Sequence, residues 1–250
     1  MYYTQHPYRC RFDWGRLGVR QAAERGDILV IVDTLSFSSA VATAVHYGGV
    51  IYPCSLDEDV GALARSMGGE AAVNRRKDVP EKGRFSLSPA TFLQIEPGTR
   101  VVLASPNGAT CSRYAERVPY LFVGALVNAK AVAAVISTLL EKQELSVTVI
   151  ACGERWKTPS EDGELRFAIE DYLGAGSILS YLQHEKSPEA RVCSGAFEQV
   201  RDDLDAILWE CASGRELREI GFGGDVQHAA HLNMYETVPH MRDNYLASFT

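Results

Sequence analysis

Residues 27–48, DILVIVDTLSFSSAVATAVHYG, constrain the fold of this chain more than any other segment. The uninterrupted apolar run 28–32 is rich in β-branched side chains, which is typical of a strand buried on both faces of a parallel sheet. Asp33 ends this run, and small apolar residues at 40–45 continue the chain into a helix that Gly48 can end. The segment therefore predicts a buried strand, a polar turn and a helix.

Hydroxyl groups follow Asp33 where the predicted strand ends. They belong to Thr34, Ser36, Ser38 and Ser39. Ligands of open α/β sheets bind beyond the carboxyl ends of the strands, where helix N-termini offer free N–H groups to anions. We therefore expect Asp33 and the serines to lie at a site. The alternative is that Asp33 is only a loop acid that precedes a helix.

Strands and helices alternate along the rest of the chain. Further strands are expected at 9–14, 50–54, 100–104, 120–124 and 146–151, helices at 15–24, 55–67, 109–117, 129–142 and from 167, polar turns at 105–108 and 152–155, irregular loops at 68–84 and 156–166, and a mainly helical end from 188. This alternation favours a three-layer α/β/α fold with a mostly parallel or mixed sheet. With 250 residues and no linker, we expect one domain over 1–250.

The net charge of −7 argues against a nucleic-acid surface. In so acidic a chain, the basic cluster Arg75, Arg76 and Lys77 is informative about an anionic ligand. The first residues do not resemble a signal peptide, and no apolar run approaches the roughly 20 residues of a membrane span. We therefore expect a cytoplasmic protein without a membrane or nucleic-acid partner, and a homo-oligomer stays an open alternative.

Six cysteines are scattered without a C-x-x-C pair, so neither a zinc site nor a disulfide framework is indicated. Cys152 follows a predicted strand, but no arginine lies six residues on, where a cysteine phosphatase loop needs one. A buried thiol is therefore expected, with a nucleophile as the alternative. The usual signatures of phosphate-binding loops, dinucleotide sites and α/β-hydrolases are also missing from the sequence.

Asp33, Glu170 and Asp171 are the best candidates for a metal site, because their carboxylates follow predicted strand ends or begin a helix. Carboxylates suit Mg²⁺, which keeps waters for substrate oxygens. Adjacent helical residues point about 100° apart, so one of Glu170 and Asp171 is expected to ligate while the other caps. The alternative is that both only complement the helix dipole.

Asp225, His228 and His231 are spaced by three residues and would share one helix face. A metal site is one interpretation of this spacing. A partly buried pair of surface histidines is the other.

Taken together, these features resemble the 2-phosphosulfolactate phosphatase family, Mg²⁺-dependent enzymes of the coenzyme M route. The likeness lies in the order and spacing of segments 32–39, 87–89, 105–110, 128–129, 170–176 and 238–239, with Asp225 before a helix. The resemblance implies a three-layer α/β/α fold. One departure is Ser36, which stands where the family pattern would carry an arginine, and another is the longer, charged stretch before Glu170. Arg155, Arg166 or the cluster 75–77 could supply the missing charge.

The resemblance implies Mg²⁺-dependent hydrolysis of a small acidic phosphate monoester, which is the expected partner. Asp33 with Glu170 or Asp171 would hold Mg²⁺ and act in catalysis, and Asp33 as nucleophile is an alternative to direct attack by water. The expected substrate-binding residues are Ser36, Ser38, Ser39, Asn107, Gly108, Asn128 and Arg155. Two other functions stay open, namely a non-catalytic protein that binds a phosphorylated or sulfonated metabolite, and a hydrolase with Cys152 as nucleophile.

Overall fold

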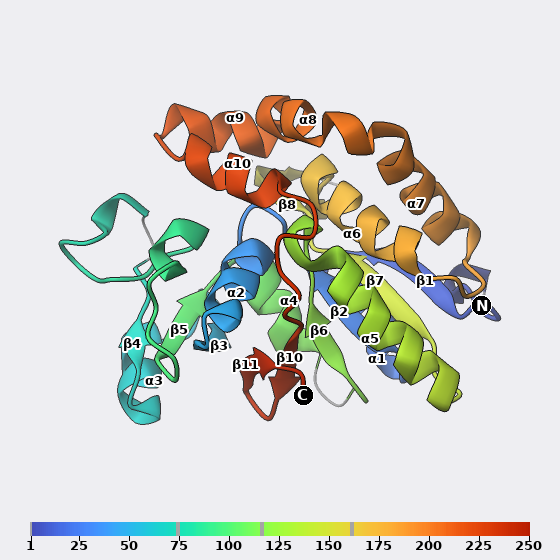
Figure 1. Ribbon diagram of the computed structural model, residues 1–250, viewed down its shortest axis with the longest axis horizontal. Helices are drawn as coiled ribbons and strands as arrows, with labels where there is room; N and C mark the ends of the chain where they lie inside the picture. The colour runs from blue at the N-terminus through green and yellow to red at the C-terminus, as the bar shows by residue number, and fades with distance from the viewer. Residues whose placement is uncertain (1, 74–75, 116–117, 161–162) are drawn as a thin grey trace.

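The computed structural model describes residues 2–73, 76–115, 118–160 and 163–250 (Figure 1). The strands are β1 (Cys10–Trp14), β2 (Ile28–Val32), β3 (Val50–Cys54), β4 (Glu70–Ala71), β5 (Arg100–Ala104), β6 (Leu121–Val123), β7 (Val147–Ala151), β8 (Glu154–Ser160), β9 (Gly163–Arg166), β10 (Pro239–Arg242) and β11 (Tyr245–Ser248). The α-helices are α1 (Gly15–Glu24), α2 (Phe37–His46), α3 (Val60–Met67), α4 (Gly108–Tyr114), α5 (Ala129–Lys142), α6 (Ile169–Tyr181), α7 (Pro188–Val200), α8 (Leu204–Glu210), α9 (Ala212–Glu219) and α10 (Gly223–Ala230). Short 3₁₀-helices lie at Tyr2–Thr4, Arg76–Asp78, Pro89–Phe92, Leu126–Asn128 and Arg201–Asp203.

Within the described residues, nine strands form one sheet in the order β1-β7-β2-β6-β10-β11-β3-β5-β4. Neighbouring strands are parallel within the block β1-β7-β2-β6 and within the block β3-β5-β4. The hairpin β10–β11 joins the two blocks through the antiparallel pairs His240↔Phe122 and Leu246↔Ile51. The sheet is therefore mixed, and β8 and β9 form a separate antiparallel ribbon.

β2 lies inside the first block, and all of its residues are fully buried. Leu29 and Ile31 pack with side chains of α1 and α2 on one face of the sheet. Val30 and Val32 pack with side chains of α5 and α6 on the other face. Because successive side chains of a strand point to opposite faces, a strand covered on both sides is apolar throughout. The prediction of a three-layer α/β/α fold is confirmed.

The helices α7 to α10 form an arch along one side of the molecule (Figure 1). α7 packs on α6, and the arch shares an apolar cluster with Leu35, Leu126 and Leu173. Leu35 follows β2 and Leu126 follows β6, so this cluster covers the carboxyl ends of two parallel strands. The described part of the chain has no helix that is long and apolar enough to cross a membrane.

Three segments differ from the expectation. Within the expected irregular loop 156–166, residues 156–160 belong to β8 and 163–166 form β9. Within the expected helical end, Pro239–Arg242 and Tyr245–Ser248 form β10 and β11. The short strand β4 also lies within the expected loop 68–84. β8 and β9 are mostly exposed, so they lack the apolar alternation that marks a strand with one buried face.

Candidate active site

Asp33 lies directly after β2 and is only 5% exposed. Its Oδ2 accepts hydrogen bonds from the Gly108 N–H at 2.7 Å and from the Ser105 hydroxyl at 3.2 Å. Its Oδ1 accepts a longer bond from the Phe37 N–H at 3.3 Å. A Cβ on Gly108 would lie 2.7 Å from Asp33 Oδ2 and would also meet the Phe37 ring, so a glycine is required here. Asp33 thus ties the end of β2 to the turn between β5 and α4.

Glu170 and Asp171 are buried in the first turn of α6. The Asp171 carboxylate accepts hydrogen bonds from the Thr34 N–H at 2.7 Å and from the Gly153 N–H at 2.9 Å. The Thr34 hydroxyl donates to the Glu170 carbonyl oxygen at 2.9 Å. The Asp171 carboxylate thus links the ends of β2 and β7 to α6. Asp33, Glu170 and Asp171 also lie close enough for their charges to act on one another.

Glu154 is a fourth acidic residue at this place, and the sequence did not assign it a role. It begins β8, and its Oε2 accepts a hydrogen bond from the Asn107 amide at 3.0 Å. The signal was present in the sequence, because Glu154 lies in the polar turn 152–155 after a buried strand. We call Asp33, Glu154, Glu170 and Asp171 the carboxylate cluster.

Burial dominates the electrostatics of the carboxylate cluster. Burial first, and then repulsion from Glu170, raise the pKa of Asp33, although the Gly108, Phe37 and Ser105 hydrogen bonds counteract the rise. Burial and the neighbouring charges raise the pKa of Asp171 well above its ordinary value. Burial followed by the charge of Asp33 raises the pKa of Glu154 to about 7.

No salt bridge joins the carboxylate cluster to an arginine, lysine or histidine within the described residues. Several carboxylates in a medium of low dielectric constant repel one another unless protons or a cation compensate their charge. The site is therefore built to attract a cation or to hold protons.

A cavity of about 200 Å³ lies beside this cluster and beneath α9. It is lined by Asp33, Leu35, Ser36, Leu87, Ser105, Pro106, Asn107, Glu154, Ser213, Glu216, Leu217 and Ile220. Ser36 and Asn107 thus face the same space as Asp33 and Glu154. The cavity has room for a small substrate.

Other predicted substrate-binding residues lie behind the cavity wall. The Ser38 hydroxyl donates to the Ile31 carbonyl at 3.2 Å and accepts from the Asp33 N–H at 2.9 Å, and the Ser39 hydroxyl donates to the Thr34 carbonyl at 2.8 Å. The amide of Asn128 is fully buried and binds the Ala125 N–H at 2.9 Å. These contacts give all three side chains a structural role, and substrate binding by them stays a prediction.

The predicted basic residues are spread over different surfaces. Arg155 donates to the Pro106 carbonyl oxygen at 2.6 Å and lines a neighbouring cavity. The Arg166 guanidinium lies 5.9 Å from the Trp156 ring centroid. Lys77 is exposed, whereas Arg75 and the Arg76 side chain lie outside the described part of the chain.

The Cys152 thiol is buried beside the carboxylate cluster. Burial, then the hydrogen bond with Cys111, and then the charges of Asp33 and Asp171 raise its pKa well above the ordinary value. A thiol nucleophile needs the opposite shift, toward the thiolate. The structure therefore favours the expected buried thiol.

Asp225, His228 and His231 do not converge on one point. Asp225 accepts a hydrogen bond from the Ser88 hydroxyl at 2.5 Å, and His228 Nε2 lies 3.0 Å from the Thr43 hydroxyl. His231 Nδ1 lies 2.8 Å from the Gln227 carbonyl oxygen and is exposed. Among the described residues, no group of three or more His, Cys, Asp or Glu side chains is arranged to hold a metal ion.

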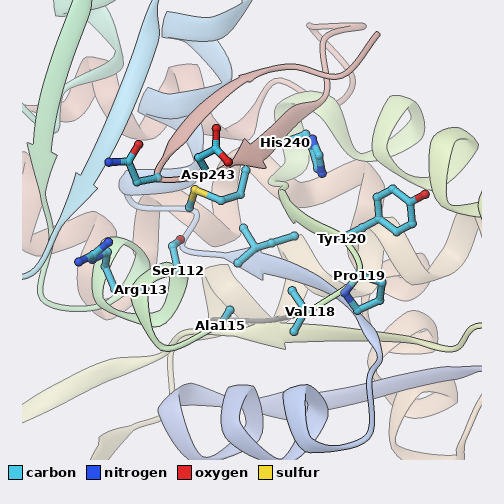
Figure 2. A pocket seen from close by; sticks show the side chains of 11 residues that line it. Ser112, Arg113, Ala115, Val118, Pro119, Tyr120, His240 and Asp243 are labelled. Carbon is cyan, nitrogen blue, oxygen red and sulfur yellow. The ribbon is translucent and has the colours of Figure 1, made fainter. Parts of the chain in front are cut away.

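A larger cavity of about 380 Å³ lies in the middle of the sheet at the other end of its strands, where β6 begins and the β10–β11 hairpin turns. Figure 2 shows Ser112 and Arg113 on one side of it and His240 and Tyr120 on the other. No member of the carboxylate cluster lines this cavity. We therefore place the candidate active site at the smaller cavity.

Known proteins resemble this chain over most of its length. A family model described as 2-phosphosulpholactate phosphatase matches residues 18–244. A Carboxydothermus hydrogenoformans protein named "Probable 2-phosphosulfolactate phosphatase" is 31% identical, and the match covers 87% of this chain and 88% of that protein. The Methanocaldococcus jannaschii protein named "2-phosphosulfolactate phosphatase" is 25% identical over 85% of this chain and 88% of its own length. These names indicate a phosphatase, which is a phosphoric monoester hydrolase.

Proposed function

Because the chain belongs to the 2-phosphosulfolactate phosphatase family, we propose that it hydrolyses a small acidic phosphate monoester related to 2-phosphosulfolactate. The observation that carries this proposal is the pair Asp33 and Glu154 of the carboxylate cluster, which lines a cavity of about 200 Å³. Burial of several acids without a positive partner destabilises the folded protein. Such groups, with raised pKa values and beside a cavity, are typical of functional sites.

Mg²⁺ fits the donor chemistry of this site. The described residues offer no cage of three ligands, but Mg²⁺ is usually bound through one or two carboxylates while it keeps several waters. We propose that Asp33, which lines the cavity, holds it together with Glu170, whose charge acts on Asp33. Asp171 lies outside the cavity lining and ties the Thr34 and Gly153 N–H groups to α6. When bound, Mg²⁺ would neutralise negative charge on the cluster and on phosphoryl oxygens.

The protein's own groups would orient the ester and move a proton. Asn107 lines the cavity beside Asp33, and its second amide hydrogen could be donated to a phosphoryl oxygen. The Gly108 N–H already donates to Asp33 and would position that carboxylate. Both protonation states of Glu154 are populated near neutral pH, since its pKa is about 7. The protonated form is suited to give its proton to the leaving alkoxide. Asp33 as nucleophile and Asp33 as metal ligand both agree with this arrangement.

Two finer assignments belong to the same proposal. The family resemblance supports a role in coenzyme M biosynthesis, and we propose a cytoplasmic location for the protein. Binding of a phosphorylated or sulfonated metabolite without turnover is the second candidate. Ser36 favours this second candidate, because a bound anion would lack the positive partner that an arginine at position 36 supplies in the family pattern.

Phosphate release from 2-phosphosulfolactate and p-nitrophenyl phosphate, with Mg²⁺ and with EDTA, tests the proposal. Turnover is expected only with Mg²⁺. Asp33→Asn should lower kcat at least about a hundredfold, and it should cost about 1 to 3 kcal/mol of stability because the Asn amide would meet an N–H donor. Urea unfolding separates the two effects, and exposed Asp202→Asn is the matched control. Equal turnover in EDTA would exclude the metal, and near wild-type kcat for Asp33→Asn would exclude both roles of Asp33.

A further inference from the structure

Two arginines from different elements converge on one carbonyl oxygen beside the candidate active site. Arg155 of β8 donates from Nη2 to the Pro106 oxygen at 2.6 Å, and Arg16 of α1 donates to the same oxygen at 3.5 Å. The separation of the two guanidinium nitrogens therefore cannot exceed the sum of these two distances. Two like charges held so close repel each other, and an anion between them would remove the repulsion.

Both arginines line a cavity of about 280 Å³. This cavity shares Pro106, Asn107 and Glu154 with the cavity that contains Asp33. The turn 105–108 is the common wall, because Ser105 and Gly108 bind Asp33 while the Pro106 carbonyl faces the arginines. The two cavities therefore adjoin at this turn, and a small molecule with two anionic groups is the ligand that suits the pair.

Neither arginine is strongly engaged by an acid in the described residues. Arg155 lies 3.6 Å from a Glu164 carboxylate oxygen, but the Glu164 side chain is 59% exposed, and such a surface pair contributes little. Arg16 forms no salt bridge in this part of the chain, and its guanidinium lies 5.6 Å from the Tyr114 ring centroid. The nearby acid Asp57 is exposed, and its pKa is lowered first by the Ser55 hydrogen bond and more weakly by the charge of Arg16. Neither arginine is therefore held by a buried acid.

We propose that Arg16 and Arg155 form the subsite for a second anionic group, a carboxylate or a sulfonate, on the phosphate ester that the enzyme hydrolyses. This inference rests on the proposed function and assigns its specificity. The planar guanidinium groups present paired N–H donors that match both kinds of anion. The subsite places positive charge on the side of the turn 105–108 away from Asp33, whereas the arginine of the family pattern would have stood at position 36.

The test compares kcat/KM of Arg16→Gln and Arg155→Gln on three substrates. The substrates are 2-phosphosulfolactate, 2-phospholactate without the sulfonate, and p-nitrophenyl phosphate without a second anion. Each variant should lose about ten- to a hundredfold more kcat/KM on 2-phosphosulfolactate than on p-nitrophenyl phosphate. If the variants lose as much kcat/KM on 2-phospholactate as on 2-phosphosulfolactate, the subsite binds the carboxylate. If their loss on 2-phospholactate is no larger than on p-nitrophenyl phosphate, it binds the sulfonate. Lysine at either position should recover part of the loss, because it restores charge without the paired donors.

Arg100→Gln is the matched control, since the exposed Arg100 also donates to a main-chain carbonyl oxygen, that of Met67 at 2.9 Å, and lines neither of the two cavities. It should keep wild-type selectivity. Calorimetric titration with sulfolactate, which has no phosphate to hydrolyse, separates the subsite from the proposed function. Weaker sulfolactate binding by the Gln variants would support the subsite even if the protein hydrolysed no ester. Equal losses on all three substrates, or equal sulfolactate affinity for variants and wild type, would overturn it.

Discussion

Glu154 stands between two cavities, and its carboxylate is held by the Asn107 amide. Its raised pKa makes the folded protein prefer the protonated acid, so its ionisation opposes folding. The group gives its full stabilisation below its unfolded pKa of about 4.5. This stabilisation is lost as the pH rises through the folded pKa of about 7.

Glu154→Gln should therefore match the wild type in stability at about pH 4 and exceed it by at least about 1 kcal/mol at about pH 8. The reason is that glutamine cannot ionise while it keeps a similar shape. Urea unfolding of both proteins in EDTA at the two pH values measures the difference. A stability difference that does not change with pH would show that Glu154 titrates near its ordinary pKa.

Ser36 lines the Asp33 cavity, where the family pattern would carry an arginine. A 2-phosphosulfolactate molecule has two anionic groups besides its phosphate, and the Arg16 and Arg155 subsite would serve one of them. Ser36→Arg should therefore raise kcat/KM on 2-phosphosulfolactate about ten- to a hundredfold, because a charge-assisted hydrogen bond is worth about 1.5 to 3 kcal/mol. Steady-state kinetics on 2-phosphosulfolactate and p-nitrophenyl phosphate checks the selectivity. Efficient hydrolysis of 2-phosphosulfolactate by the wild type, with no gain in Ser36→Arg, would show that the substitution is neutral.

At the scale of elements, the hairpin β8–β9 positions two site residues at its base. Glu154 and Arg155 are its first residues, and Gly153 connects them to β7. Gly153 has a φ of 67°, and a Cβ there would lie 2.6 Å from Leu165 Cδ1. The hairpin can therefore approach β7 only because residue 153 is a glycine.

Gly153→Ala should lower the free energy of unfolding by more than about 1 kcal/mol and also reduce kcat, because it strains the backbone and displaces Leu165. Gly163→Ala is the matched control, since Gly163 has a φ of 93° and open space around its would-be Cβ. It carries the backbone strain alone and should cost less. Urea unfolding measures both variants, and equal destabilisation would mean that the Leu165 contact is unimportant.

Buried elements of this fold were predictable, whereas exposed or centrally inserted ones were not. The strand 28–32 and the helix 15–24 have strong apolar patterns, and the structure confirms them. Because ligands of α/β sheets bind at strand ends, the sequence also predicts that Asp33 and the acids of α6 lie close together, and the structure places them so. The role of Glu154 was not predicted, because the exposed strand that it begins has no apolar periodicity. The strands β10 and β11 were not predicted, because four residues show too little alternation of apolar and polar side chains.

At the scale of the whole molecule, the site combines distant parts of the sequence. Asp33 comes from the first sheet block, Ser105 and Asn107 follow the second block, and α9 closes the cavity with Ser213 and Leu217. The molecule is acidic overall, yet it presents two arginines beside the site. The acids of the carboxylate cluster come from segments that are distant in sequence, and they repel one another. A cation bound by them should therefore stabilise the fold as a whole.

Mg²⁺ should raise the melting temperature, because a ligand that binds only the folded state stabilises by about 2.7 kcal/mol at about a 100-fold excess over its Kd. For a chain of this size, that corresponds to an upward shift of roughly 5 to 11 °C. Differential scanning calorimetry in EDTA and in Mg²⁺ checks the shift. The shift should be lost in Asp33→Asn and Glu170→Gln but kept in Asp202→Asn. No shift in the wild type, or the same shift in all variants, would contradict a Mg²⁺ site at the cluster.

The hairpin β10–β11, which joins the two parallel blocks of the sheet, is synthesised after both of them. β10 pairs with β6 through His240↔Phe122, and β11 pairs with β3 through Leu246↔Ile51. The ribosome therefore completes both parallel blocks before it delivers the hairpin that joins them. Contacts between residues so far apart in sequence form slowly, and unpaired strand edges are prone to aggregate. During synthesis, β6 and β3 keep unpaired edges until the hairpin leaves the exit tunnel, so this is the period in which the chain can pair wrongly with another chain.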